Sequence, residues 1–418
     1  EEDKAKMKEF LPYWKGKSLY DKWHAAVPEE VMKTHWNSLY ITNSGCLSGV
    51  HLAHVGVDYE KVLTIGLNGI KKQVDAELEQ LDFGEMKSLE KFHFLKAVKI
   101  TMDAAIAFAE RYAALARSLA QKETEPQRKI ELGKIAEICS WVPANPARSF
   151  HEALQAIWFI LIILWIEGLG PGITLGRPDQ YLYPFFQRDL AEGKITRDEA
   201  RQLLAMLLIK INDLAILMST EFVEQLAGFP TLTNITIGGV TKEGKNAVNE
   251  LSYLFLEAEL VVGLTVEEFI IRVNKNNPDT FLMKACEVAK SLKGKLKFIS
   301  DDTTIQQFLA KGMPVEYARD YIVAGCFTPT VPAFSFDTSA AMVNLPLILE
   351  LALNNGVSRL TGEQIGPQTG DPEKFTSFDD VWNAFKTQVE AVVPKGMLLR
   401  NADRKVYADY APCPFQSA

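Results

Sequence analysis

Residues 323 to 332 read VAGCFTPTVP and place a thiol, Cys326, directly after a short apolar segment. Gly325 lets the backbone turn or approach another group closely, while Pro329 and Pro332 restrict the chain that follows. These neighbours would hold the sulfur in a fixed place, where it could react with a substrate. The structural alternative is a cysteine that only fills space, because free cysteines are often small core residues.

Ionic chemistry at this thiol has little support. A thiolate nucleophile needs a neighbouring base, and the segment from 323 to 332 contains no histidine. Three histidines, His24, His35 and His93, stand among helical and charged residues, where surface or packing roles are expected. The cysteines are widely separated, so they predict neither a metal site nor disulfides but a reducing compartment. They are Cys46, Cys139, Cys286, Cys326 and Cys413.

The chain that positions Cys326 alternates helical and extended patterns, which favours an α/β fold in one large body. Apolar residues recur every three or four positions from 86 to 121 and predict a long amphipathic helix. Another helix should begin at Thr196, which forms a capping box with Glu199. Strands walled by helices are expected at 231–239, 267–273, 296–300 and 320–325. Cys326 follows the last of these strands, and strand ends often present chemistry.

Composition narrows the class of protein. The 418 residues are 47% hydrophobic and 23% charged, as in globular chains, and the net charge is −8 without a basic face. We therefore expect no nucleic-acid partner. The apolar run from 157 to 166 has about half the roughly 20 residues that a membrane span needs, and it predicts a buried core element. The N-terminal residues show no signal-peptide pattern, so a cytoplasmic protein without membrane contact is expected.

The segment EYARDYIVAGCFTPTVP, residues 316 to 332, resembles the active-site cysteine loop of glycyl radical enzymes, the pyruvate formate-lyase and glycerol dehydratase family. Further segments resemble the family in the family's order, so the resemblance covers nearly the whole chain. These segments are 56–70, 149–160, 173–196, 233–258, 278–291 and 345–372.

This resemblance implies a fold and a chemistry. The fold would be an α/β barrel of ten strands in two antiparallel half-sheets, surrounded by helices, with the cysteine on a loop inside. The family stores a radical on a backbone glycine, and a radical S-adenosylmethionine activating enzyme installs it. Cys326 would be the catalytic residue, receiving the radical and taking a hydrogen atom from a small-molecule substrate, which requires no base. The resemblance also implies a homodimer in full-length form, anaerobic metabolism, and no bound cofactor or metal.

Departures from the family pattern narrow the reaction. Pyruvate formate-lyases have two adjacent cysteines where this chain has Gly325 and Cys326, which argues against acyl transfer. The eliminases of the family carry a Cys-x-Glu base, whereas this chain has Thr328, which takes up no proton near neutral pH. The Gly-His-Ser loop of the polyol dehydratases reads GPGITLGR here, with Pro171 and Gly172 in place of the polar pair.

A site that loses polar groups favours a weakly polar substrate. We therefore expect carbon–carbon bond formation or cleavage, of the benzylsuccinate synthase or arylacetate decarboxylase kind. A radical dehydratase or C–O or C–N lyase of the glycerol dehydratase type is the alternative. Against the addition reaction, no arginine that could hold a dicarboxylate stands between Cys326 and Arg359.

Other candidate residues surround these positions. The family's His-x-x-x-Asp-Tyr stretch is present as His54, Asp58 and Tyr59, and a hydrogen-bonded structural role is the alternative for His54. The adjacent carboxylates at 267 and 268 could form an acid/base pair or a solvated strand start. The candidate substrate-binding residues are therefore His54, Asp58, Pro171, Gly172, Phe327 and Thr328.

The Arg-Val-x-Gly-Tyr motif of the family's radical glycine is not present in the sequence. We therefore interpret residues 1–418 as a pyruvate formate-lyase-type domain that is incomplete at both ends and has no separate glycine-radical domain. Such a chain would be inactive by itself and would need the C-terminal glycyl radical region as a partner. A catalytically silent scaffold or binding subunit is the competing class, although the presence of Cys326 favours an enzyme.

Overall fold

The computed structural model describes most of the chain, and its contacts divide the chain into two compact units. Unit 1 combines both ends, Glu1–Leu52 and Thr338–Ala418, and unit 2 is Ala53–Asp337. The described residues are 2–35, 41–43, 56–168, 172–214, 233–264, 268–293, 295–325, 327–332 and 342–410.

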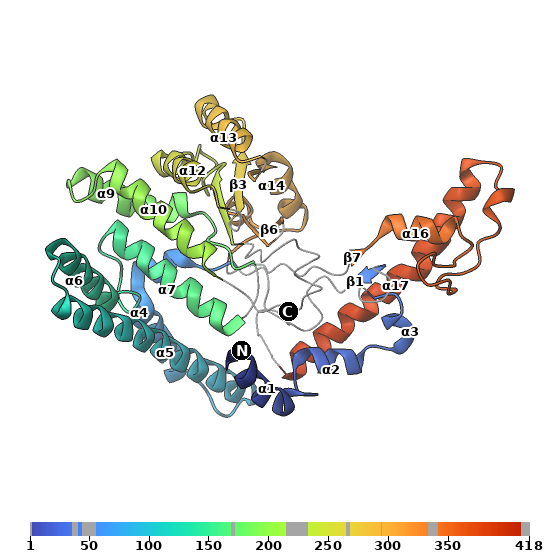
Figure 1. The fold of residues 1–418 in the computed structure, drawn as a ribbon, viewed down its shortest axis with the longest axis horizontal. Coiled ribbons are helices and arrows are strands. Elements are labelled where there is room, and N and C mark those ends of the chain that lie inside the picture. The colour runs from blue at the N-terminus through green and yellow to red at the C-terminus, as the bar shows by residue number, and fades with distance from the viewer. Residues whose placement is uncertain are drawn as a thin grey trace. The chain divides into compact units, whose positions relative to one another are not determined.

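Unit 2 carries the sheet and most of the helices (Figure 1). Its described helices are α4 (Tyr59–Glu79), α5 (Met86–Lys122), α6 (Pro126–Trp141), α7 (Phe150–Gly168), α8 (Pro178–Tyr181), α9 (Tyr183–Ala191), α10 (Arg197–Asn212), α12 (Glu250–Val262), α13 (Asp279–Ser291), α14 (Asp301–Ala310) and α15 (Val315–Arg319). Its described strands are β2 (Asn234–Gly238), β3 (Glu268–Val273), β4 (Lys297–Ser300), β5 (Ile322–Ala324) and β6 (Thr328–Thr330).

Strands β2, β3 and β4 form a parallel sheet in that order, with helices between successive strands. Because side chains alternate between the faces of a strand, each strand divides its residues between two environments. On one face, Ile235 and Ile237 of β2 and Ile271 of β3 enter the main core, which also contains Phe255 of α12 and Phe281 of α13. This outer face anchors the sheet to its helices.

The opposite, inner face of the sheet receives a different set of residues. Ile270 of β3 and Ile299 of β4 pack with Tyr321, Val323 and Val331 in a second, smaller core. These last three residues lie in or next to β5 and β6. The hairpin of β5 and β6 is therefore packed against the inner face, away from the helices of the main core.

The helical layer explains the long apolar run in the sequence. That run lies within helix α7 (Phe150–Gly168). The segment Phe150–Glu167 of this helix has the length and composition of a membrane-crossing helix. Half of this segment is buried within the structure. Ile157 and Leu161 are fully buried in the main core, which is the core role expected from the sequence.

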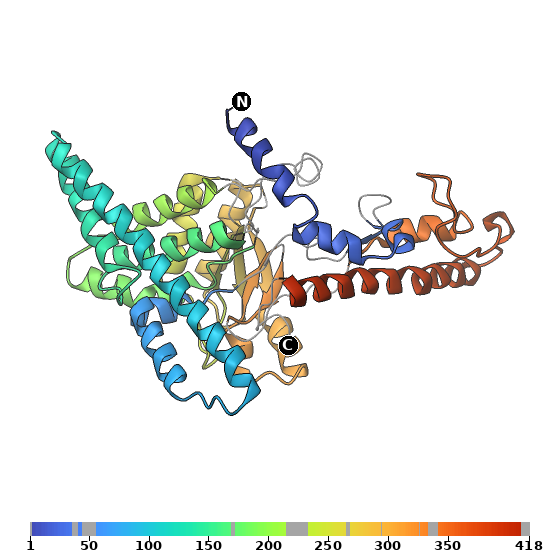
Figure 2. The same cartoon turned by 90° about the horizontal axis from the view of Figure 1, so that it is seen from below.

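Unit 1 is built around the long helix α17 (Phe378–Tyr410), along which α2 and α16 lie (Figure 2). Trp23 of α2 packs with Leu399 and Val406 of α17 in a small core. The other described elements of this unit are α1 (Glu2–Trp14), α2 (Leu19–Ala26), α3 (Glu29–Met32), α16 (Leu345–Ala352), the 3-10 helix η1 (Pro372–Lys374), and the paired strands β1 (Thr42–Asn43) and β7 (Met342–Val343).

Most local predictions are confirmed. Helix α5 occupies the predicted amphipathic segment, and Thr196 caps α10 by accepting a hydrogen bond from the Glu199 amide at 3.2 Å. The predicted strands correspond to β2, β3, β4 and β5. The mixed α/β fold is therefore confirmed. The larger sheet has three strands within the described part of the chain, so the ten-stranded barrel stays a prediction.

Candidate functional site

The hairpin of β5 and β6 carries the segment that the sequence singled out. The two strands are antiparallel, with Ala324 opposite Thr328, so residues 325 to 327 join them. Gly325 is buried and has a φ of +57°, a left-handed conformation that favours glycine. Pro329 of β6 stands opposite Val323 of β5. Proline has no N–H to donate, and it is tolerated in a strand at the edge of a sheet. Cys326 itself lies outside the described residues.

Inner-face side chains of the sheet hold the backbone that leads to Cys326. Asn234 Nδ2 donates a hydrogen bond to the Gly325 carbonyl at 2.8 Å, and Thr236 Oγ1 accepts one from the Val323 N–H at 3.2 Å. Both residues belong to β2 and are fully buried. Because they are two positions apart on one strand, they face the same side and meet alternate residues of the hairpin.

Arg272 of β3 continues this arrangement. Its Nη1 donates to the Tyr321 carbonyl at 3.0 Å and its Nη2 to the Arg319 carbonyl at 2.8 Å. We call Asn234, Thr236 and Arg272 the anchoring row. Between them they bind the backbone at residues 319, 321, 323 and 325. The row fixes the path of the chain as far as Gly325, the residue before Cys326.

A buried ion pair supports Arg272. Its Nε donates to Asp301 Oδ1 at 2.7 Å, and both side chains have no solvent exposure. The Tyr321 hydroxyl donates to the same carboxylate at 2.8 Å, and the guanidinium lies 3.9 Å from the Tyr321 ring centroid. Burial raises the pKa of Tyr321, so this phenol stays a hydrogen-bond donor. The arrangement satisfies both charges and favours one orientation of the arginine.

Arg177 forms a second charged link beneath the hairpin. Its Nη1 donates to Asp320 Oδ1, just before β5, at 3.1 Å. Its Nη2 donates to the carbonyl of Gly238, the last residue of β2, at 3.1 Å and to the Val240 carbonyl at 2.9 Å. Burial and the neighbouring Arg272 lower the pKa of Arg177. This guanidinium therefore joins the end of β2 to the start of β5.

Gly56 lets a second segment approach the hairpin closely. A Cβ atom on Gly56 would lie 2.7 Å from the Ile322 side chain, which is too close, whereas one on Gly176 would lie 3.5 Å from it, an ordinary contact. Gly56 forms a bridge with Thr174, and Gly176 forms one with Ile235 of β2. The segments that begin at 56 and at 172, each of which resembles the family, thus meet next to β5.

The candidate substrate-binding residues divide into those that the structure describes and those that it does not. Thr328 is half-buried on β6, and the Phe327 side chain is 40% exposed, with Lys297 Nζ 6.0 Å from its ring centroid. Gly172 is buried with a φ of +100°. Asp58 is exposed and accepts a hydrogen bond from the Lys61 amide as the N-cap of α4, so its described contact is structural. His54 and Pro171 lie outside the described residues.

The paired carboxylates at 267 and 268 show one structural contact. Glu268 begins β3 and forms an ion pair with Lys297 of β4 at 2.5 Å, while Glu267 lies outside the described residues. This contact fits the structural interpretation of the pair.

Tyr59 is fully buried 5.8 Å from the Tyr181 ring, and burial raises its pKa. Its role in the described structure is packing between α4 and α8.

Sequence reasoning did not single out the anchoring row, Asp301 or Arg177. One signal was available for Arg272, since a charged residue inside the otherwise buried strand EEFIIRV requires a partner. Asn234 and Thr236 give no comparable signal, because Asn234 stands at the start of β2 and threonine is common within strands.

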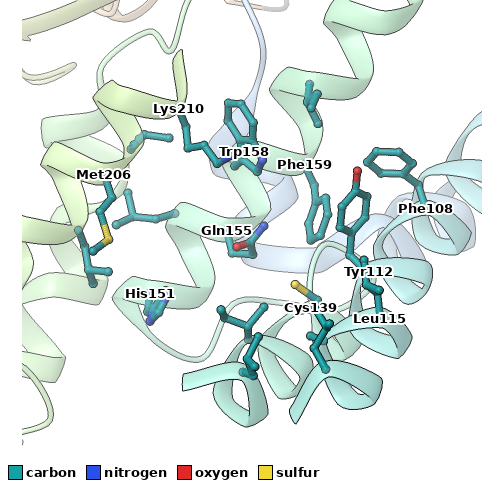
Figure 3. A pocket seen from close by; sticks show the side chains of 18 residues that line it. Phe108, Tyr112, Leu115, Cys139, His151, Gln155, Trp158, Phe159, Met206 and Lys210 are labelled. Carbon is teal, nitrogen blue, oxygen red and sulfur yellow. The ribbon is translucent and has the colours of Figure 1, made fainter. Parts of the chain in front are cut away.

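A separate groove of about 500 Å³ lies among helices α5, α6, α7 and α10 (Figure 3). Its walls are mainly apolar, with Trp158 and Lys210 together along one part and Cys139 along another. None of the candidate site residues lines it. Burial raises the pKa of the Cys139 thiol to about 11, so the groove offers no thiolate near neutral pH. We therefore do not assign the reaction to this groove. The described residues also contain no cluster of metal-binding side chains.

Known proteins resemble this chain in sequence and in overall fold. A solved structure concerned with 1,2-propanediol dehydration in Roseburia inulinivorans matches with a TM-score of 0.93 and 35% identity, covering 100% of this chain and 50% of that one. The isethionate sulfite-lyase of Nitratidesulfovibrio vulgaris is 37% identical over 403 residues, 93% of this chain and 48% of the relative. The indoleacetate decarboxylase of Tractidigestivibacter scatoligenes is 29% identical over 401 residues, 92% of this chain and 44% of the relative.

The fold and these relatives define the class as the glycyl radical enzymes. The family model described as pyruvate formate lyase-like matches residues 1–418, and the chain belongs to that family. The resemblance found in the sequence is thereby confirmed. The chain spans about half the length of the curated relatives that it matches.

Proposed function

We propose that the protein containing this chain is a glycyl radical lyase in which Cys326 takes a hydrogen atom from the substrate. The observation that carries this proposal is the anchoring row, which binds four alternate backbone positions up to Gly325, the residue before Cys326. A packing cysteine needs no such support. A hydrogen-transfer residue does, because an error of about 1 Å in reactant geometry can cost on the order of 10²-fold in rate.

In the proposed step, the Cys326 sulfur carries the unpaired electron. An S–H bond forms, a substrate C–H bond breaks, and the unpaired electron moves to the substrate carbon. The neighbouring carbon–heteroatom bond then breaks, the leaving group departs with the electron pair of that bond, and the proton of the substrate hydroxyl is released. The product radical takes the hydrogen atom back from the Cys326 thiol, which recovers its radical. The family's glycyl radical, installed by a radical S-adenosylmethionine activating enzyme, would supply the unpaired electron. A full-length homodimer remains part of the same proposal.

The relatives favour elimination over carbon–carbon bond formation. The names of the two more similar proteins reported above refer to a sulfite-lyase and to a dehydration. We therefore propose cleavage of a carbon–heteroatom bond next to the radical carbon. Cleavage of this kind corresponds to the dehydratase or C–O or C–N lyase that the sequence analysis gave as the alternative. It departs from the first expectation, carbon–carbon bond formation or cleavage, which rested on the loss of polar groups from the site.

Thr328 supports a second candidate. It is half-buried on β6, opposite Ala324, and its hydroxyl cannot exchange a proton near neutral pH as a carboxylate would. Carbon dioxide leaves without taking up a proton, so its departure needs no acid, and the proton that replaces the carboxylate on carbon would come from water. The decarboxylase among the relatives makes arylacetate decarboxylation the second candidate.

The test uses the full-length protein, activated anaerobically by its activating enzyme. We expect the doublet of a glycyl radical in electron paramagnetic resonance and turnover of a small 2-hydroxyalkyl sulfonate or vicinal diol. An arylacetate is the competing substrate, and carbon dioxide release from it would favour the second candidate.

The variant Cys326→Ser is the matched control for the role of the thiol. It should keep the glycyl radical doublet and lose turnover by at least about 10³-fold, because an alcohol O–H is too strong a bond for this exchange. If Cys326→Ser turns over at the rate of the parent protein, the proposal is wrong.

A further inference from the structure

The residue in contact with the carbonyl before Cys326 is Asn234. Its Nδ2 lies 2.8 Å from the Gly325 oxygen, across 91 positions of sequence. Both groups are buried, so water does not compete for this hydrogen bond. We propose that Asn234 is a positioning residue that sets the orientation of the peptide joining Gly325 to Cys326. This inference rests on the proposed function of Cys326.

Asn234 is itself held rigidly. Its carbonyl accepts hydrogen bonds from the Leu175 amide at 2.9 Å and from the Thr174 hydroxyl at 2.8 Å. On the other side, Asn234 stands opposite Glu268 in the parallel pair of β2 and β3. The backbone that carries the carboxamide is therefore fixed from both sides, and only the side-chain torsions remain.

The orientation of the carboxamide follows from its partner. A carbonyl oxygen accepts but cannot donate, so the Asn234 amino group must face Gly325. Within the described structure, Asn234 Oδ1 is buried and has no hydrogen-bond partner. A buried acceptor without a partner carries a free-energy cost, which the Gly325 contact must help to offset. An apolar side chain would avoid this cost but would leave the buried Gly325 carbonyl without its donor.

Gly325 explains why an external contact is needed. With a φ of +57°, this residue adopts a conformation that glycine reaches easily, and glycine can leave it as easily. The next peptide unit is planar, so the direction of the Gly325 oxygen sets the plane in which the Cys326 nitrogen lies. Gly325 by itself leaves the backbone free to change conformation, and the hydrogen bond from the Asn234 amide restrains it.

The test compares Asn234→Leu and Asn234→Ala in the activated full-length protein. Leucine has nearly the shape of asparagine but no donor, so the first variant removes the hydrogen bond with the least change in packing. Both variants should lower kcat by about 100-fold while KM changes by less than about threefold. The glycyl radical doublet should keep its amplitude. The deuterium isotope effect on the substrate C–H bond should rise, because hydrogen transfer becomes slower than the other steps.

Ser252→Ala is the matched structural control. The Ser252 hydroxyl is fully buried and donates to Asp179 at 2.7 Å, away from the hairpin. This variant should lower the melting temperature by an amount similar to Asn234→Ala and leave the isotope effect unchanged. If Asn234→Leu keeps the parent kcat, or if its kcat falls no further than that of Ser252→Ala, the positioning role is overturned.

The outcome for Cys326→Ser separates this inference from the proposed function. An inactive Cys326→Ser together with a fully active Asn234→Leu would overturn the positioning role alone. An active Cys326→Ser would overturn the proposed function, and the positioning role with it.

Discussion

At the scale of single residues, the environment of each thiol decides its chemistry. Cys139 is 3% exposed and packs against Phe159, and burial raises its pKa to about 11. At pH 8 a thiol with that pKa is ionised to roughly one part in a thousand. Cys286, on α13, is exposed. The sequence gives no reason to distinguish these two cysteines, since both occur in helical segments.

We expect iodoacetamide at pH 8 to modify Cys286 within minutes and to leave Cys139 unmodified in the folded protein. Peptide mass mapping after a timed quench measures both rates, and labelling in denaturant provides the control in which both thiols react. The rate at Cys139 should rise with pH toward 11. Equal labelling of the two residues under native conditions would contradict the buried, protonated state of Cys139.

At the scale of elements, the hairpin depends on the buried pair of Arg272 and Asp301. Arg272→Met removes two hydrogen bonds to the backbone just before the hairpin, at Arg319 and Tyr321, and leaves the Asp301 carboxylate buried without its counter-ion. Breaking a buried pair in this way costs about 3 to 5 kcal/mol. We therefore expect a decrease of this size in the free energy of unfolding, measured by urea denaturation.

Arg197→Met serves as the comparison for this prediction. Arg197 pairs with Glu257 at 2.8 Å, but its side chain is 47% exposed. Exposed pairs contribute less than about 1 kcal/mol, so this variant should unfold close to the parent midpoint. Similar midpoints for the two variants would show that the Arg272 pair does not support the hairpin.

At the scale of the whole chain, the two compact units should respond differently to acid. His35 belongs to unit 1, is 1% exposed, and lies 5.1 Å from the Trp23 ring centroid. Burial lowers its pKa from 6.5 to about 4. The unfolded chain therefore binds a proton at His35 before the folded chain does. Stability is full above pH 6.5 and is lost as the pH falls toward 4, by up to about 3 kcal/mol.

We expect amide hydrogen exchange in residues 19–35 to accelerate between pH 7 and pH 4.5, after correction for intrinsic rates. The peptide at 319–325 should change less, because the anchoring row contains no histidine. His35→Phe should remove most of the acceleration in unit 1, whereas His93→Gln, at an exposed position of unit 2, should not. Unchanged exchange in His35→Phe would mean that other groups cause the loss.

Sequence patterns could predict the features that depend only on residues close together along the chain. The spacing of apolar residues located α5, the pair Thr196 and Glu199 located the start of α10, and β-branched segments located β2 to β5. The motifs around Cys326 also identified the family, because they are long and occur in order. Each of these signals lies within one continuous segment, where local geometry controls the outcome.

Only the tertiary structure decided how the Cys326 segment is supported. Asn234 and Gly325 are 91 positions apart, and Arg272 and Tyr321 are 49 apart. No local pattern tells which polar side chain of a strand will meet which carbonyl of a distant hairpin. That pairing arises when the sheet buries Ile235 and Ile237 on its outer face and thereby turns Asn234 and Thr236 inward, where a buried amide or hydroxyl must find a partner.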